Sequence, residues 1–198
     1  MDTLAYKHRY SLKEYYKILL PIIPAARILK RNKQEQIVSE QMIERLMLAV
    51  TEVNDCALCS YAHTNMALDM GLSQEEIESL LSGSDLFVQP EEATAILFVQ
   101  GYAEDRGVLT IERYHNLIAS YGKEKSEVIL AAAQGMMIGN IIGLPLSALT
   151  SRFKGKKYSN SSLFYEIFMP LSLLILLPLT LLHRLAMVLG IMEKPLAP

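Results

Sequence analysis

Apolar residues recur along most of this chain at the period of an α-helix. Between residues 35 and 53 they fall three or four positions apart, which places them on one face of a helix. That face consists of Ile37, Met42, Ile43, Leu46, Met47 and Val50. No segment alternates apolar and polar residues in the way that is typical of a β-strand. The pattern therefore predicts an all-α protein built as a helical bundle.

Capping and breaking residues set the ends of the other predicted helices. Gly71 is placed to end one helix in a left-handed conformation, and Ser73 with Glu76 has the spacing of a capping box that begins the next. Pro21 and Pro24 interrupt the N-terminal segment. Beyond residue 53, helices are predicted over residues 56–70, 73–83, 90–107, 110–121 and 125–143.

The C-terminal region is strongly apolar. The run from Ile167 to Leu182 carries no charged side chain, although it contains two prolines. It follows a basic patch made of Arg152, Lys154, Lys156 and Lys157. As a straight helix the run would extend about 24 Å, which is short of the roughly 30 Å hydrocarbon core of a bilayer. The tail could contact a membrane, with the basic patch at anionic headgroups, or bury its apolar surface against a neighbouring subunit.

These patterns divide the chain into an N-terminal helical segment (1–33), a core (34–150) and a basic patch with an apolar C-terminal tail (151–198). A length of 198 residues suffices for a domain with a proper core, and a mixed net charge of −2 argues against nucleic-acid binding. Two cysteines cannot form the disulfide framework of small secreted proteins. We therefore expect a cytoplasmic protein, associated with the cytoplasmic face of the membrane if the tail binds lipid.

The two cysteines and one histidine form the most informative motif. Cys56, Cys59 and His63 are three and four positions apart, so on one helix they project from the same side. Asn54 and Asp55 belong to residue types that cap helices, which predicts that the first turn begins near Cys56. A helix N-terminus stabilises a thiolate, and two thiols at this spacing can close to a disulfide. The motif predicts a redox site with its own base.

Three other interpretations of the cysteines compete with the redox site. Zinc could be held by Cys56, Cys59 and His63, but structural zinc usually takes four ligands, and no second Cys or His pair lies nearby in the sequence. Two inert, buried cysteines would leave the paired spacing and the histidine without an explanation. A structural disulfide within one helix would add little stability, because the loop that it closes is short. Redox chemistry is favoured over all three.

The segment from Glu44 to Ser84 resembles the core of the carboxymuconolactone decarboxylase and alkylhydroperoxidase AhpD superfamily, in the branch that contains a Cys-x-x-Cys pair. The shared elements are Glu44, Cys56, Cys59, His63, Gly71 and the helix start from Ser73 to Ile77. A later segment with Glu127, Gly139 and Asn140 is similar to the closing helix of the family. The resemblance covers roughly residues 35–145. It implies an AhpD-like helical bundle, extended here by an apolar C-terminal helix, that forms a homo-oligomer and needs no cofactor.

The resemblance also implies roles for the site residues. Cys59 would meet the oxidant, and Cys56 would resolve the resulting sulfenic acid or mixed disulfide by forming the Cys56–Cys59 bond. Glu44 would orient the imidazole of His63, which would help to deprotonate the thiol. The helix N-terminus by itself favours a thiolate at Cys56, whereas the neighbouring histidine favours one at Cys59. The substrate would be a hydroperoxide or a disulfide, and a thiol protein or small thiol would be the reductant.

The sequence departs from the family pattern at Leu58, directly before the second cysteine. Members with peroxidase chemistry can carry a histidine there, and many others carry a tyrosine. The leucine cannot act as a proton-relay partner, so disulfide exchange and redox sensing are alternatives to peroxide reduction. Decarboxylation is disfavoured because that branch lacks the cysteine pair. The principal alternative is a redox-responsive binding or scaffold protein, in which the Cys56–Cys59 bond switches a surface without turnover.

Overall fold

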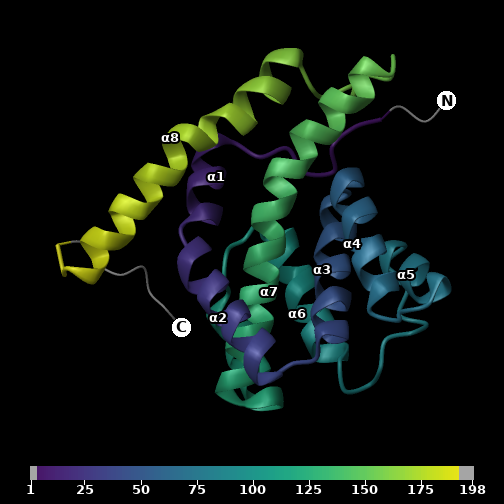
Figure 1. Ribbon diagram of the computed structural model, residues 1–198, viewed down its shortest axis with the longest axis vertical. Helices are drawn as coiled ribbons and strands as arrows, with labels where there is room; N and C mark the ends of the chain where they lie inside the picture. The colour runs from purple at the N-terminus through teal and green to yellow at the C-terminus, as the bar shows by residue number, and fades with distance from the viewer. Residues whose placement is uncertain (1–3, 192–198) are drawn as a thin grey trace.

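The computed structural model describes residues 4–191, and within them the chain is helical apart from its connections (Figure 1). The outer ends of the predicted segments 1–33 and 151–198 lie outside the described residues. The helices are α1 (Leu12–Leu19), α2 (Ile22–Glu35), α3 (Glu40–Asn54), α4 (Ala57–Asp69), α5 (Gln74–Leu81), α6 (Ala93–Glu104), α7 (Ile111–Phe153) and α8 (Leu163–Val188). The predicted all-α fold with an apolar C-terminal helix is confirmed.

α7 is the central helix of the bundle. It runs through the middle of the molecule (Figure 1) and packs against α2, α3, α4, α6 and α8. α4 also packs against α3, and α5 packs against both of them. The core between α3, α6 and α7 contains the buried side chains of Leu46, Val50, Val99, Ile129 and Met137. α7 therefore links the outer helices to one another through its long apolar surface.

α2 occupies a segment in which the sequence predicts a break. Pro21 lies immediately before this helix and Pro24 in its first turn, where backbone N–H groups have no partner within a helix in any case. The two prolines therefore begin a helix rather than end one. Because α2 runs to Glu35, α3 begins at Glu40, behind its N-cap Ser39, and not at residue 35 as predicted.

α7 joins two helices that the sequence predicts separately. Gly122 has φ 74° and ψ 165°, so it interrupts the helix between the segments predicted over residues 110–121 and 125–143. The predicted end at residue 143 is wrong, because α7 continues to Phe153.

The continuation of α7 passes through Pro145, which ordinarily breaks a helix. Proline has no N–H to donate and leaves the carbonyl four residues earlier without its helical partner. That carbonyl belongs to Ile141, and the hydroxyl of the fully buried Tyr15 on α1 donates a hydrogen bond to it. A tertiary contact thus replaces the helical hydrogen bond that the proline removes.

The predicted ends of α4 and α5 are found in the structure. Gly71 follows α4 with φ 88°, the left-handed conformation expected of it. The hydroxyl of Ser73 accepts the backbone N–H of Glu76 at 3.1 Å and caps α5. The carboxylate of Glu76 accepts a hydrogen bond from Nε of Arg45 on α3 at 2.5 Å. The residue predicted to complete a local capping box therefore ties α5 to α3.

α8 is continuous over 26 residues although Pro170 and Pro178 lie inside it. At about 1.5 Å per residue it is about 39 Å long, so the two prolines do not break the apolar C-terminal helix predicted from the sequence. α7 and α8 are the two described helices that are long and apolar enough to cross a membrane. The most apolar window of α7 is 67% buried within the protein, whereas that of α8 is only 17% buried. α7 is thus a core helix, and α8 exposes most of its apolar surface.

An ion pair fastens the start of α8 to the end of α7. Nε and Nη2 of Arg152 donate hydrogen bonds to the two carboxylate oxygens of Glu166 at 2.6 and 2.7 Å, and Glu166 is fully buried. The hydrogen bonds from Arg152 hold the pKa of Glu166 below its ordinary value. α8 is therefore fixed to the bundle through a charged pair that faces the protein interior.

We expect this pair to stabilise the fold in a pH-dependent way. The pKa of Glu166 is lower in the folded than in the unfolded chain, so its contribution is complete above the unfolded value of about 4.5 and is lost as the pH falls through the folded value. Near neutral pH, Glu166→Gln should lower the melting temperature by roughly 5 °C or more, because Arg152 loses its charged partner. Thermal unfolding followed by circular dichroism across the acid range measures this difference, which should shrink below about pH 4.

The matched control for this prediction is Glu112→Gln, a change at an exposed carboxylate on the same helix as Arg152. It should leave the melting curve unchanged at every pH. A difference between the wild-type protein and Glu166→Gln that stays constant from neutral to acid pH would show that the pair does not act through its charges.

Candidate active site

A disulfide joins Cys56 to Cys59 at the start of α4. Their Cα atoms are 5.2 Å apart, and Cys56 is the N-cap residue of the helix. Its Sγ atom accepts the backbone N–H of Cys59 at 3.3 Å. The predicted helix start near Cys56 is found, but Asp55 does not cap it. Asp55 instead ends α3 in a left-handed conformation with φ 55°, so the cysteine itself takes the capping position.

His63 and Glu44 form a hydrogen-bonded pair one helical turn beyond the disulfide. Nδ1 of His63 lies 2.7 Å from Oε2 of Glu44, whose side chain is only 3% exposed. A carboxylate can only accept a hydrogen bond, so Nδ1 carries the hydrogen and Nε2 is left as the basic atom of the ring. The structure therefore brings together the two residues that the sequence separates by 18 intervening positions. His63 remains 16% exposed at its side chain, so its free nitrogen can exchange protons with a bound molecule.

The two sulfur-bearing residues differ in their access to solvent. Cys56 is completely buried, whereas Cys59 is 7% exposed. Cys59 also shares a helical face with His63, because the two are four positions apart within α4. Because Cys59 is the less buried of the two, we expect an incoming thiol to attack its sulfur, and the Cys56 sulfur lies where the helix N-terminus stabilises a departing thiolate. The helix N-terminus therefore acts on the sulfur of Cys56, and the histidine on the sulfur of Cys59, as the sequence predicts.

α7 closes over the disulfide through small residues that the sequence analysis did not assign to the site. A side chain at Gly143 would place its Cβ atom 2.5 Å from Sγ of Cys59 and 2.6 Å from Sγ of Cys56, closer than real Cβ atoms approach other atoms. The Gly139 carbonyl lies 3.7 Å from Sγ of Cys59, and the hydroxyl of Ser147 accepts the backbone N–H of Leu58 at 3.0 Å.

A signal for this contact is present in the sequence. Gly139, Gly143 and Ser147 are spaced four residues apart, which gives α7 a stripe of small residues on one face. The stripe lets the backbone of α7 approach the first turn of α4. It was missed because helix α7 was predicted to end at residue 143.

Gly143→Ala should destabilise the oxidised protein by about 1 to 3 kcal/mol, the usual penalty for adding a methyl group to a filled site. The new Cβ atom would overlap both sulfurs, and a disulfide has no flexible end that could move away. Denaturant unfolding of the oxidised and reduced proteins measures the loss. Gly139→Ala is the control, since a Cβ atom there meets only a Met136 side chain at 3.4 Å. Equal losses in the two variants would show that the disulfide does not set the limit at Gly143.

The described residues include no group of three or more His, Cys, Asp or Glu side chains that could hold a metal ion. The cysteines named in the zinc interpretation are bonded to each other.

Two cavities lie in or near this region of the bundle. The smaller, of about 170 Å³, is lined by Glu44 together with the apolar side chains of Leu29, Ile43, Met47 and Met70, among others. Glu44 and Met70 both lie at its wall, so this space is next to the Glu44–His63 pair.

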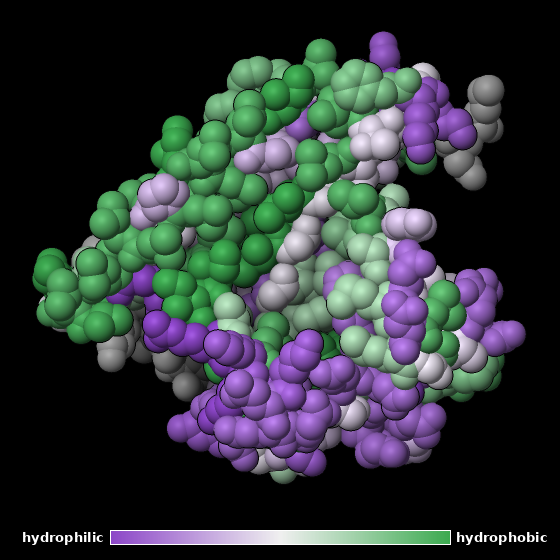
Figure 2. Space-filling view, in the orientation of Figure 1, coloured by the Kyte–Doolittle hydropathy of each residue, from purple (hydrophilic) through white to green (hydrophobic). Residues whose placement is uncertain are grey.

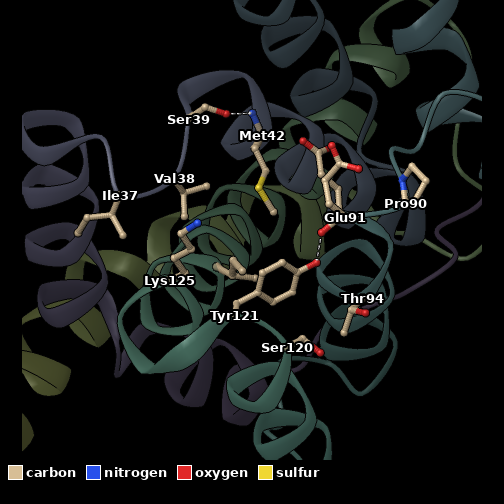
Figure 3. Close-up of a pocket in the computed structure, with 12 residues that line it drawn as sticks. Ile37, Val38, Ser39, Met42, Pro90, Glu91, Thr94, Ser120, Tyr121 and Lys125 are labelled. Atoms are coloured by element: carbon tan, nitrogen blue, oxygen red, sulfur yellow. Dashed lines mark hydrogen bonds between the residues drawn. The ribbon is translucent and has the colours of Figure 1, made fainter.

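The larger cavity, of about 590 Å³, lies apart from the disulfide between α3, α6 and α7 (Figure 3). Its lining includes Met42, Tyr121 and Lys125, and the hydroxyl of Tyr121 donates a hydrogen bond to the Glu91 carbonyl at 2.5 Å. None of the four predicted site residues lines it. Cavity size therefore does not mark the candidate redox site.

The family model described as the carboxymuconolactone decarboxylase family matches residues 27–100. The matched segment begins within α2, ends within α6, and contains the whole motif from Glu44 to His63. Over this segment the chain is similar to the carboxymuconolactone decarboxylase family. No curated protein and no solved structure matches the chain.

The family-model match confirms the resemblance drawn from the motif, with different limits. The match begins earlier than the expected residue 35 and ends well before residue 145. Gly143 and Ser147 consequently come from a part of α7 that lies outside the match. The cysteine pair and its histidine lie within the matched segment, whereas the surface that covers the disulfide belongs to α7, which lies outside the match.

Proposed function

We propose that this chain is a thiol–disulfide oxidoreductase of the carboxymuconolactone decarboxylase family, with Cys56 and Cys59 as its redox pair. The observation that carries the proposal is a disulfide at a helix N-terminus, one turn from a histidine that is hydrogen-bonded to a buried carboxylate. A structural disulfide needs no such pair. The pair Glu44–His63 supplies a base that can move a proton to and from a thiol.

The catalytic cycle begins with the reduced protein. The thiolate of Cys59 attacks one sulfur of a substrate disulfide, the S–S bond of the substrate breaks, and one thiolate leaves. Cys59 is then joined to the other half of the substrate. The thiolate of Cys56 attacks Sγ of Cys59, the second half leaves as a thiolate, and the Cys56–Cys59 bond forms. The substrate has gained two electrons and the protein has lost two.

A hydroperoxide would be reduced by the same route, with an alcohol leaving in place of the first thiolate. The Cys59 thiolate attacks the terminal oxygen, the O–O bond breaks and an alcohol leaves, which gives a sulfenic acid on Cys59. Attack by Cys56 then releases water and forms the same disulfide. A dithiol protein or two small thiols would return the two electrons, which suits a reducing compartment such as the cytoplasm. Leu58 supplies no proton at this site, so we rank disulfides before hydroperoxides as substrates.

The proton movements fall to His63. Nε2 of its imidazole takes the proton of the Cys59 thiol before the attack, and the buried carboxylate of Glu44 stabilises the positive charge that results. The imidazolium then gives the proton to the thiolate or alkoxide that leaves. Each cycle therefore ends with the ring neutral and ready for the next substrate.

Steady-state turnover tests this proposal. The reduced protein is mixed with excess dithiothreitol and either a small disulfide or tert-butyl hydroperoxide, and consumption of the oxidant is followed. We expect many turnovers per protein molecule, and none in a Cys59→Ser variant. Consumption of a single equivalent of oxidant, with no further reaction, would instead make the chain a redox-responsive binding protein, the alternative from another class.

A further inference from the structure

The outer face of α8 lacks the polar residues that a surface helix normally exposes, while its buried face combines Tyr165, Met169 and Met187 with three polar residues. In a water-soluble protein, the apolar stripe of such a helix faces the core and its polar residues face water. Here the polar side chains of Glu166, Ser172 and Thr180 are buried against the bundle. The outer face carries Leu174 and Ile175, which are 76% and 73% exposed.

The outer face is apolar along the whole helix. Residues on it recur every three or four positions and include Leu171, Leu174, Ile175, Leu182, Leu185 and Val188, all exposed. Figure 2 shows a broad, mostly hydrophobic surface over α8 and the neighbouring part of α7, whereas hydrophilic residues gather at the bottom and at the upper right of the view. An exposed apolar surface of this extent marks a contact with a partner or a membrane.

A groove between α8 and α2 continues this surface. It encloses about 400 Å³ and is lined by the apolar side chains of Ile22, Ile23, Ala26, Leu177 and Leu181, with Arg27 and Lys30 also part of the wall. Arg27 and Lys30 are exposed. An apolar trough beside two cations matches the chemistry of an acyl chain below an anionic headgroup.

The charged residues that border the apolar surface are basic. From residue 15 to residue 34 every charged residue is Lys or Arg, and the only acidic residue of α2 is its last, Glu35, which is paired with Arg31. From residue 128 to residue 165 every charged residue is again Lys or Arg, and Lys154, Lys156 and Lys157 are exposed next to the start of α8. Positive charge thus lies next to the start of α8 and beside Leu177 and Leu181 in its second half, although the whole chain has a net charge of −2.

We propose that the outer face of α8 and the groove beside it bind the surface of an anionic phospholipid bilayer, with α8 lying in the plane of the interface. A helix in this position sinks its apolar face among the acyl chains and keeps basic residues at the headgroups. The proposal is independent of the redox function, because it uses none of the residues of the disulfide site.

A helix that crosses the bilayer fits the structure less well. The inner face of α8 packs against α1 and α7, and its Glu166 is paired with Arg152 in the interior. Insertion across the membrane would have to strip α8 from the bundle and place that carboxylate in hydrocarbon. Binding in the plane leaves these contacts in place.

A second copy of the chain also fits less well. A symmetric dimer joins the same patch of both subunits. If two α8 faces were paired, the basic residues beside the face in one copy would lie opposite basic residues of the other copy. Like charges placed opposite each other disfavour such a dimer. A bilayer with anionic lipid supplies the negative charge that a second copy lacks.

Flotation of the full-length protein with lipid vesicles tests the proposal. We expect the protein to float with vesicles that contain phosphatidylglycerol and to stay at the bottom with vesicles of phosphatidylcholine alone. Leu174→Asp combined with Ile175→Asp should abolish flotation, and Leu97→Asp, at a leucine of α6 that is 70% exposed, is the matched control. Arg27→Glu combined with Lys30→Glu should weaken vesicle binding roughly thirtyfold, whereas Lys123→Glu should not change it.

The position of the helix in the bilayer is measured separately. The chain contains no tryptophan, so Leu174→Trp introduces a single indole on the outer face of α8. Its fluorescence should be quenched most strongly by lipids brominated near the headgroup end of the acyl chain, and Leu97→Trp should not be quenched. Quenching that is strongest at the bilayer centre would overturn the in-plane orientation.

Two further results would overturn the proposal as a whole. One is a full-length protein that binds neither kind of vesicle. The other is a drop in oligomer mass on light scattering for the Leu174→Asp, Ile175→Asp variant with unchanged vesicle binding, which would assign the outer face of α8 to a second copy of the chain. Redox turnover serves as the independent readout, since it should be the same in all of these variants.

Discussion

A Cys56→Ser variant is expected to accumulate a covalent adduct on Cys59 when it meets a disulfide substrate. The accessible sulfur belongs to Cys59, and without Cys56 nothing resolves the mixed disulfide that forms on it. Turnover should fall on the order of a hundredfold or more, because the second half of the cycle is lost. Mass spectrometry of the variant, after less than one equivalent of a small disulfide, measures the adduct and its position.

The complementary variant is the control for this experiment. Cys59→Ser leaves only the completely buried Cys56, so it should react slowly and form no comparable adduct. The assignment of the two sulfurs would be reversed if Cys56 in the Cys59→Ser variant were modified faster than Cys59 in the Cys56→Ser variant. In that case the helix N-terminus, and not the histidine, would decide which thiol attacks.

Replacing His63 by alanine is expected to slow the reaction of the Cys59 thiol near neutral pH by at least about tenfold, general bases commonly contributing a hundredfold or more. The imidazole is held by Glu44 at 2.7 Å with its Nε2 free to take a proton. Glu44→Gln should slow the reaction less, since the amide oxygen can still accept the Nδ1 hydrogen but no longer balances the charge of an imidazolium. Alkylation of Cys59 by iodoacetamide in the Cys56→Ser background measures both rates.

The pH dependence of alkylation separates a base from a packing residue. With His63 present the rate should depend on the protonation of the imidazole as well as on that of the thiol, and His63→Ala should leave only the dependence that belongs to the thiol. His115→Ala removes an exposed histidine of α7 and should change nothing. Equal rates in the wild-type background, His63→Ala and Glu44→Gln would mean that the pair has a structural role only.

The sequence by itself determined the helical class and the arrangement of the motif. Apolar spacing is a property of a single helix, so α3 could be predicted without knowing its neighbours. Its predicted start at residue 35 was wrong, because α2 extends to Glu35. Gly71 and Ser73 act on backbone groups within a few residues of themselves, and both ends that they predict are found. Cys56, Cys59 and His63 share one helix, which fixes their common face from the sequence alone.

Only the tertiary structure decided the features that depend on contacts between distant segments. Pro145 predicts a break, and α7 continues because the hydroxyl of Tyr15 reaches the freed carbonyl of Ile141 from another helix. Gly143 belongs to the candidate site because the backbone of α7 lies directly against the disulfide at this residue. Nothing within either local segment specifies such a contact.

The orientation of α8 belongs to the same class. An apolar run of this composition can be a core helix, a membrane span or a surface helix, and hydropathy does not distinguish them. The bundle decides which face of the helix is exposed, because it buries Glu166 opposite Arg152 and covers Ser172 and Thr180. Which face of a helix is exposed is a property of what packs against the other face, and that is why the sequence could identify the apolar tail without showing where its surface points.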